Sequence, residues 1–274
     1  MKAAGIKIVN SIPGLKVHAK VALVRRMENK ELINYSFLAT GNFNEATGRF
    51  YTDHVFFTAS KDFGQELEWL FEYLQSRKQP GDYMKIPFRH LLVSQFNMVK
   101  RFEKLIDREI KNAKKGKPAS IIIKLNNLQE KNMVERLYRA AKAGVKVHLL
   151  VRSVCGFAPG IEGQSENVTV TRIVDRYLEH PRVFVFHNKG EPLYFMGSAD
   201  WMNRNLHSRI EVVFPVYDKL LCEEINQILT LQLLDNKKAV SLKSNLENQR
   251  IQALPGEPSI AAQEAIYNFV KGLS

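Results

Sequence analysis

The chain has 274 residues, of which 45% are hydrophobic and 25% are charged. This composition predicts one large domain or two of ordinary size, and it excludes a disordered chain, which has too few apolar residues to offset the entropy lost on ordering. The two cysteines, Cys155 and Cys222, are too few for a disulfide framework and lack the close partners of a zinc site.

The chain is strongly basic, with 40 lysines and arginines against 28 acidic residues and a formal net charge of +12. Such a surface attracts anions, so DNA, RNA, nucleotides and inorganic phosphate chains are all candidate partners, and a merely solubilising surface is the alternative. The N-terminal residues lack the pattern of a secretory signal, and no stretch reaches the roughly 18 apolar residues of a membrane span. We therefore expect a cytoplasmic protein.

The N-terminal part begins with a strand-like segment at 5–11 (GIKIVNS) and continues with a strand at 21–24. An amphipathic helix follows, in which four apolar residues recur at helical spacing: Leu67, Leu70, Phe71 and Leu74. No βαβ unit precedes the first strand, so we expect a domain truncated at its N-terminus. Proline and glycine at 79–87 (QPGDYMKIP) predict the boundary with the next part.

A basic helix predicted at 94–117 opens the second part, with its charges on a solvated face. Strands at 120–125 (SIIIKL) and 145–151 (VKVHLLV) then flank a helix that ends before Gly144, which predicts a βαβ unit with a parallel pair of strands. The remaining predicted elements are strands at 182–186, 193–196 and 210–213, a helix carrying Leu221, Ile225, Ile228 and Leu229, and a terminal helix at 258–273. The fold class is therefore α/β, divided into 1–80, 81–250 and a helical tail at 251–274.

A weak internal repeat runs through both parts. In the first part KVHAKVALV precedes ATGNFN and YTDHVFF, and in the second LEHPRVFVF precedes MGSADWMNRN and SRIEVVF. Each copy has a histidine two residues before a basic residue at the start of a strand, and then a turn with glycine. Gly41 and Gly197 follow their histidines by 23 and 17 residues, so the copies differ in loop length.

The paired residues are His18 with Lys20 and His180 with Arg182, and residues two apart on a strand share a face. An imidazole acts as a nucleophile or an acid near neutral pH, and a neighbouring cation neutralises phosphoryl oxygens. Two such half-sites that face each other would form a phosphoryl-transfer centre. A lone histidine on an edge strand is more often structural, but the repeated arrangement favours chemistry.

Other site types have less support in the sequence. The chain contains no GxxxxGK[ST] loop, GxGxxG or HExxH, and acidic residues are sparse around both histidine segments, so familiar kinase classes and metal-only hydrolysis are disfavoured. The remaining histidines lack a basic companion in this setting and are interpreted as structural or surface residues: His54, His90, His148, His187 and His207.

At these residues the chain resembles the phospholipase D superfamily, whose paired HxK segments build one active site, and more specifically the C-terminal half of the long, phosphohistidine-forming polyphosphate kinases. The segments that carry the resemblance are PGLKVHAKVALV, ATGNFNEATGRFYTDHVFFTA, LVRSVCGFAPG, RIVDRYLEHPRVFVF and MGSADWMNRNL. Arg182 departs from ordinary phospholipase D, where a lysine is expected, and this disfavours phosphodiesterase activity.

The resemblance implies phospholipase D-like domains with mixed sheets flanked by helices. It implies that His18 becomes phosphorylated and that His180 shares in catalysis. It further implies nucleotide contacts from three residues and phosphate contacts from two: Tyr51, Arg152 and His180 for the former, and Lys20 and Arg182 for the latter. No metal ligand is assigned within the chain, since the family's Mg²⁺ ligands lie upstream of the HxK segment.

The implied reaction is reversible transfer of the terminal phosphate of ATP to inorganic polyphosphate, with ATP, ADP and polyphosphate as partners. A homo-oligomer is expected, nucleic acid is disfavoured, and peripheral membrane association of the longer protein is left open. The fragment alone is expected to be inactive, because its metal and part of its nucleotide contacts would lie upstream. The alternatives are a phospholipase D-like phosphodiesterase or nuclease, and a non-catalytic module that binds polyanions.

Overall fold

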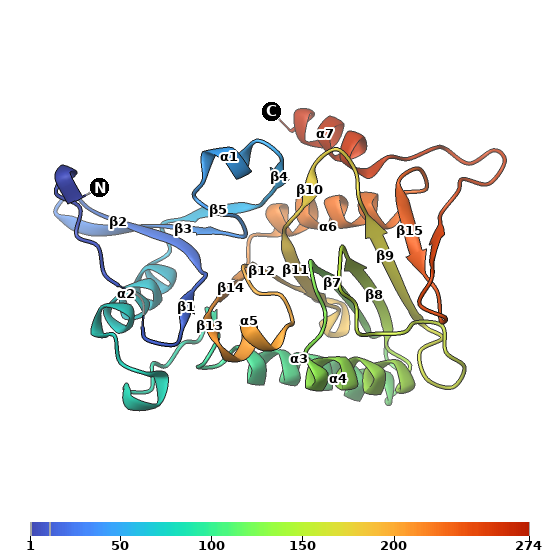
Figure 1. Cartoon of the computed structure of the whole chain (residues 1–274), viewed down its shortest axis with the longest axis horizontal. Coiled ribbons are helices and arrows are strands. Elements are labelled where there is room, and N and C mark those ends of the chain that lie inside the picture. Colours follow the sequence, from blue (N-terminus) through green and yellow to red (C-terminus); the bar gives the residue numbers. More distant parts are fainter. Residues whose placement is uncertain (1, 11, 274) are drawn as a thin grey trace.

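The computed structural model describes residues 2–10 and 12–273. Two sheets follow one another along the long axis of the molecule, a three-stranded sheet near the N-terminus and a nine-stranded sheet in the C-terminal part (Figure 1). The strands of the N-terminal part are β1 (Lys16–Val17), β2 (Lys20–Glu28), β3 (Glu31–Ala39), β4 (Tyr51–Thr52) and β5 (Val55–Thr58). Its helices are α1 (Glu45–Gly48) and α2 (Lys61–Ser76), and the small sheet has the order β2-β3-β5.

The nine-stranded sheet has the order β16-β15-β9-β8-β7-β11-β12-β14-β6. Its strands are β6 (Leu92–Val93), β7 (Ser120–Leu125), β8 (Lys146–Val151), β9 (Val168–Ile173), β11 (Arg182–Phe186), β12 (Leu193–Gly197), β14 (Val212–Val216), β15 (Ala239–Leu242) and β16 (Asn248–Arg250). Strands β7, β8 and β9 are parallel and the other pairs are antiparallel. The expected α/β class with mixed sheets is therefore confirmed, as is the parallel pair of the βαβ unit.

Helices cover both faces of this sheet. They are α3 (Met98–Ala113), α4 (Lys131–Lys142), α5 (Asn203–His207), α6 (Lys219–Leu233) and α7 (Ala262–Lys271). Phe184 and Phe186 of β11 pack in the core beneath α3 and α4, whereas Val183 and Val185 pack in a second core with Ile225 of α6. Because successive side chains of a strand point to opposite faces, the continuous apolar run of β11 is what allows both layers to pack on it.

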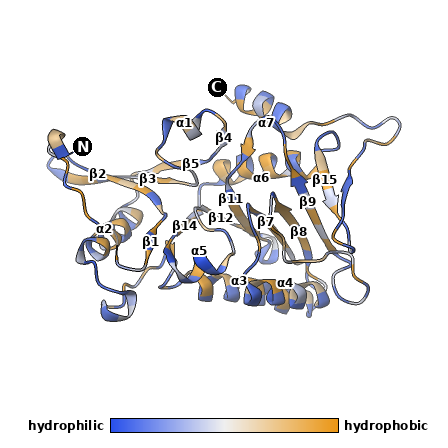
Figure 2. Cartoon of the chain, in the orientation of Figure 1, coloured by the Kyte–Doolittle hydropathy of each residue, from blue (hydrophilic) through white to orange (hydrophobic). Residues whose placement is uncertain are grey.

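The distribution of hydropathy matches this layering. Figure 2 shows hydrophobic residues along β7, β8 and β11, and mixed hydrophobic and hydrophilic residues along α3 and α4. Gly144 follows α4 with φ +90°, a left-handed conformation that suits glycine where a helix ends. Among the described residues, none of the helices is long and apolar enough to cross a bilayer.

Some predicted elements differ from the structure. Residues 5–10 form no strand, because no described strand pairs with them, and Ser11 lies outside the described residues. Helix α3 begins only at Met98, because the side chain of Asn97 bonds Val93 N–H and the carbonyls of Phe88 and Leu91 instead of extending the helix. The terminal helix begins at Ala262, whose N–H donates to Asp235, so it is shorter than predicted.

The predicted strand at 210–213 is also divided. It forms β13 (Arg209–Ile210) and β14, with Glu211 between them. Strand β13 pairs in parallel with β1, and β10 (Leu178–Glu179) pairs in parallel with β4. Each of these two-residue pairings joins the N-terminal part to the C-terminal part, and each ends next to one of the repeated histidines. The fold thus places both histidines at the junction of the two parts.

Candidate active site

His18 lies directly after β1 and faces a carboxylate from the other part of the chain. Its Nδ1 is 2.9 Å from Oε2 of Glu211, a side chain with no exposed surface. Glu211 also accepts hydrogen bonds from the Ser198 hydroxyl and, at 2.6 Å, from Asn205 Nδ2. A carboxylate only accepts, so we assign the ring proton to Nδ1 of His18. The Nε2 atom then carries the lone pair that a nucleophile needs.

His180 has the same relationship with the opposite part. Its Nδ1 is 2.8 Å from Oδ1 of Asp53, and that carboxylate accepts a second hydrogen bond from Thr40 Oγ1 at 2.7 Å. Burial lowers the pKa of His180 below its ordinary value, although the hydrogen bond to Asp53 acts in the opposite direction. The lowered pKa favours the neutral ring at pH 7, and we assign its proton to Nδ1 because the Asp53 carboxylate accepts.

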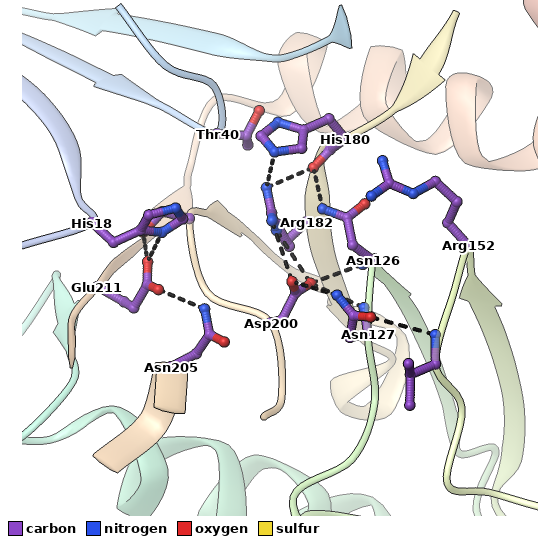
Figure 3. Close-up of polar contacts among 12 residues, drawn as sticks. His18, Thr40, Asn126, Asn127, Arg152, His180, Arg182, Asp200, Asn205 and Glu211 are labelled. Carbon is purple, nitrogen blue, oxygen red and sulfur yellow. Dashed lines mark hydrogen bonds and ion pairs between the residues drawn. The ribbon is translucent and has the colours of Figure 1, made fainter. Parts of the chain in front are cut away.

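The two halves match residue by residue. Thr40 and Ser198 each bond a carboxylate that follows thirteen residues later, Asp53 and Glu211 respectively. Each carboxylate then accepts from the histidine of the other part, so the two half-sites exchange their acidic residues. Figure 3 shows His18 with Glu211 on one side of the junction and His180 on the other.

A cation covers the second nitrogen of each histidine. Lys20 Nζ is 2.9 Å from Nε2 of His18, and Arg182 Nη1 is 3.1 Å from Nε2 of His180. Burial lowers the pKa of Lys20 to about 8, against the attraction of Glu211, and the nearby Arg182 charge lowers it further. The charge of Lys20 in turn lowers the pKa of His180. The basic companions of the two half-sites therefore share one electrostatic environment.

Tyr51 and Arg152 lie beside His180. The ring centroids of Tyr51 and His180 are 4.9 Å apart, and Arg152 Nη1 donates to the carbonyl of Glu179 at 2.6 Å. Burial lowers the pKa of Arg152, and the Arg182 charge adds to the effect. All six residues predicted from the sequence thus gather at the junction, while their roles stay predictions.

Sequence reasoning missed the acidic residues of the site. Asp53, Asp200 and Glu211 lie near the histidines only in the folded chain, and the expectation that acidic residues are sparse there does not hold for the structure. One signal was available, since the equal thirteen-residue spacing from Thr40 to Asp53 and from Ser198 to Glu211 is visible in the repeat.

The residues present do not fit a magnesium site. The described residues contain no group of three or more histidine, cysteine or acidic side chains that could hold a metal ion. The carboxylates nearest the histidines, Asp53 and Glu211, already accept hydrogen bonds from them. The described part of the chain therefore contains no preformed cluster of such side chains that would bind Mg²⁺ without further ligands.

Two family models match successive parts of the chain. Residues 1–80 match the family described as "Polyphosphate kinase C-terminal domain 1", and residues 91–263 match "Polyphosphate kinase C-terminal domain 2". Polyphosphate kinases from Vibrio vulnificus and Escherichia coli K12 are 42% and 41% identical to this chain over 270 residues. That alignment covers 98% of this chain and 38% of each relative, so the chain spans well under half the length of the curated relatives it matches.

Solved structures agree with this comparison. The polyphosphate kinase of Porphyromonas gingivalis is 44% identical and superposes with a TM-score of 0.91, covering 99% of this chain and 41% of that one. A phosphatidylserine synthase from Haemophilus influenzae superposes at a TM-score of 0.53 with 11% identity, over 88% of this chain and 68% of its own. The second likeness shows a shared fold alone.

Proposed function

Because the chain belongs to the polyphosphate kinase family, matching its C-terminal domains, we propose that it carries the phosphohistidine site of an ATP:polyphosphate phosphotransferase. The observation that carries the proposal is the hydrogen bond between His18 Nδ1 and the buried Glu211 carboxylate. It leaves the Nε2 lone pair of His18 for attack on phosphorus.

In the first step His18 Nε2 attacks the γ-phosphorus of ATP. The N–P bond forms, the bond from phosphorus to the β–γ bridging oxygen breaks, and ADP leaves with that electron pair. The ring keeps its Nδ1 proton and becomes a cation, so the negative charge of Glu211 stabilises the intermediate. Preorganised charge of this kind supplies most of the catalysis in phosphoryl transfer.

In the second step the terminal oxygen of a polyphosphate chain attacks the phosphohistidine. The N–P bond breaks, its electron pair returns to Nε2, and the ring is neutral again. Lys20 and Arg182 lie two residues from the histidines and supply the positive charge that the phosphoryl oxygens need. Each step reverses through the same atoms, which supports ATP synthesis from polyphosphate as well.

The nucleotide is proposed to bind beside His180. Tyr51 presents its ring next to that histidine, and the half-buried Arg152 guanidinium lies close enough to Arg182 for their charges to interact. An aromatic ring with two arginines nearby suits a base attached to a polyphosphate. The roles of Tyr51, Arg152 and His180 in nucleotide contact rest on this arrangement.

Other expectations from the sequence stay predictions. They concern the domain boundaries at 1–80, 81–250 and 251–274, Mg²⁺ as a cofactor, a homo-oligomer, the cytoplasm as the location, and the low activity of the fragment alone.

The test uses the longest chain that carries this sequence. With γ-labelled ATP and a polyphosphate primer, we expect acid-labile label on the protein and label in the polymer. His18→Ala should abolish both, whereas His148→Ala should leave both unchanged, since His148 bonds Thr169 on β9 rather than the site. Hydrolysis of a phosphodiester with no labelling from ATP would instead support the phosphodiesterase alternative.

A further inference from the structure

The two half-sites differ in how firmly the cation is held over the histidine. In both, the basic residue bonds the same two atoms of its histidine. Lys20 Nζ contacts Nε2 and, at 2.6 Å, the carbonyl of His18, and Arg182 Nη1 contacts Nε2 and, at 2.8 Å, the carbonyl of His180. A hydrogen bond to Nε2 occupies the lone pair that would attack phosphorus. Each cation therefore has to leave before its histidine can react.

Arg182 is fixed in place. Its Nε and Nη2 each lie 3.3 Å from an oxygen of Asp200, and both side chains are only 5% exposed. Asp200 is itself held by the backbone N–H groups of Asn126 at 2.8 Å and Asn127 at 3.2 Å. Withdrawing a guanidinium that is paired in this way would leave a buried carboxylate without its partner, which is costly.

Lys20 has no such anchor. Within residues 2–10 and 12–273 it forms no ion pair, and Asp53 and Glu211 act on it only through space. The position that corresponds to Asp200, two residues after the hydroxyl of the turn, is the exposed Asn42. The Lys20 ammonium has three N–H donors on a flexible stem, so it can keep its bond to the His18 carbonyl while another donor turns from Nε2 to an arriving phosphoryl oxygen. The ring of His18 is also more exposed, at 21% against 10% for His180.

We propose that the anchored Arg182–Asp200 pair prevents phosphorylation of His180, and so restricts the covalent phosphate to His18. Arg182 and Asp200 act here as positioning residues through His180. The inference rests on the proposed function, but it concerns the intrinsic reactivity of two ring nitrogens, which can be measured without ATP.

Phosphoramidate provides that measurement. Near neutral pH the nitrogen of phosphoramidate is protonated, so when the histidine Nε2 attacks the phosphorus the P–N bond breaks and ammonia leaves with the electron pair. Neither a nucleotide nor a further reactant is needed. Label at each histidine is quantified by peptide mass spectrometry under conditions that preserve phosphohistidine. In the unmodified chain we expect His18 to be labelled about 10- to 100-fold faster than His180, the factor that one charged hydrogen bond supplies.

Two variants should free the Nε2 atom of His180 from its hydrogen bond with Arg182. Arg182→Lys replaces the fork with a flexible stem, and Asp200→Asn removes the anchor but keeps the arginine. Each should raise labelling of His180 at least about tenfold relative to His18. Arg136→Lys is the matched control, because that arginine pairs with Glu103 and Asp107 on α3, away from both histidines. General loosening of the fold would instead raise labelling of all histidines together.

The opposite substitutions, in the first half-site, should block the Nε2 atom of His18. Lys20→Arg combined with Asn42→Asp places an arginine and a carboxylate at the two positions that correspond to Arg182 and Asp200, and we expect labelling of His18 to fall about tenfold or more. Equal labelling of both histidines in the unmodified chain, no label at His18, or an unchanged His18 to His180 ratio in the two releasing variants would overturn the inference. Failure of labelling by ATP alone would count against the proposed function and not against this selection.

Discussion

His18 and Glu211 are separated by 193 residues, yet His18 Nδ1 lies 2.9 Å from the Glu211 carboxylate. The contact exists because β1 and β13 pair in parallel, with Val17 opposite Ile210, and each strand then continues into one member of the pair. The same relationship joins His180 and Asp53 after β10 and β4. Each histidine is therefore oriented by the part of the chain that does not contain it.

Glu211→Gln should slow phosphorylation of His18 by about 10²- to 10⁴-fold, because the amide no longer stabilises the imidazolium and favours the wrong tautomer. The KM for ATP should change little, since Glu211 contacts the ring and not the nucleotide. Single-turnover labelling checks the rate. Glu45→Gln, on the exposed surface of α1, is the control, and a loss confined to KM would contradict the assigned role.

The rate of His18 phosphorylation should fall above about pH 8. Burial lowers the pKa of Lys20 to about 8, so Lys20 is charged below that pH and loses its proton above it. A neutral amine compensates less of the charge on the phosphoryl oxygens. In Lys20→Arg the alkaline decline should disappear at any absolute rate, because arginine stays protonated. If the rate fell in the same way in that variant, the titration of another group would be responsible for the decline.

The buried charge of Lys20 should also lower the free energy of unfolding near neutral pH. Its pKa is about 8 in the folded chain and 10.5 when unfolded, so between these values the unfolded chain binds more protons and the free energy of unfolding rises with pH. The full change is about 3 kcal/mol. Lys20→Met should remove this rise and stabilise the fold at pH 7, as measured by denaturant unfolding from pH 7 to 11. An identical slope in both proteins would argue against a buried cation.

His180 should take up a proton at a lower pH than an ordinary histidine does, because its pKa is lowered. Burial lowers its pKa, and Asp53 is the group that raises it, so Asp53→Asn should lower the pKa further. Because the folded pKa lies below the unfolded one, the stability linked to this ring is complete above about pH 6.5 and is lost as the pH falls through the folded pKa. Nitrogen NMR titration follows the ring directly. Asp175→Asn, whose partner is Lys238, should leave the titration unchanged.

Gly197→Ala should destabilise the fold by about 1–3 kcal/mol. A Cβ at this position would contact the carbonyl of Val212 and lie 2.6 Å from Cα of Val213, and this rigid backbone cannot move aside as a side chain would. Gly48→Ala is the control, because nothing lies within 4 Å of a Cβ there. Chemical denaturation measures both. Equal stability of the two variants would mean that β12 and β14 pack less closely than described.

Much of the fold could be predicted from local pattern. The parallel strands β7 and β8 are rich in apolar residues, and Gly144 marks the end of the helix between them, so each element carries its own signal. The start of α3 could not be predicted in this way, because the Asn97 side chain is occupied by contacts with the segment before it. Residues 5–10 are apolar enough for a strand, but a strand also needs a partner, and the sequence does not identify one.

The site could be predicted in part for a related reason. The pairs of His18 with Lys20 and of His180 with Arg182 recur within short segments, so repetition makes them visible. Asp53 and Glu211 recur too, but their partners lie in the opposite half, and no spacing along the chain indicates that exchange. The anchoring of Arg182 by Asp200 is likewise a contact between the first residue of β11 and the turn after β12, and only the folded chain brings them together.

Transient phosphorylation of His18 is tested most directly by a rapid-quench pulse and chase. The longest chain that carries this sequence is mixed with γ-labelled ATP for one turnover and then with unlabelled polyphosphate. We expect label to appear first on His18 and then to decay at the rate at which labelled polymer forms. Labelled polymer formed at an undiminished rate while His18 stays unlabelled, or in His18→Ala, would contradict it.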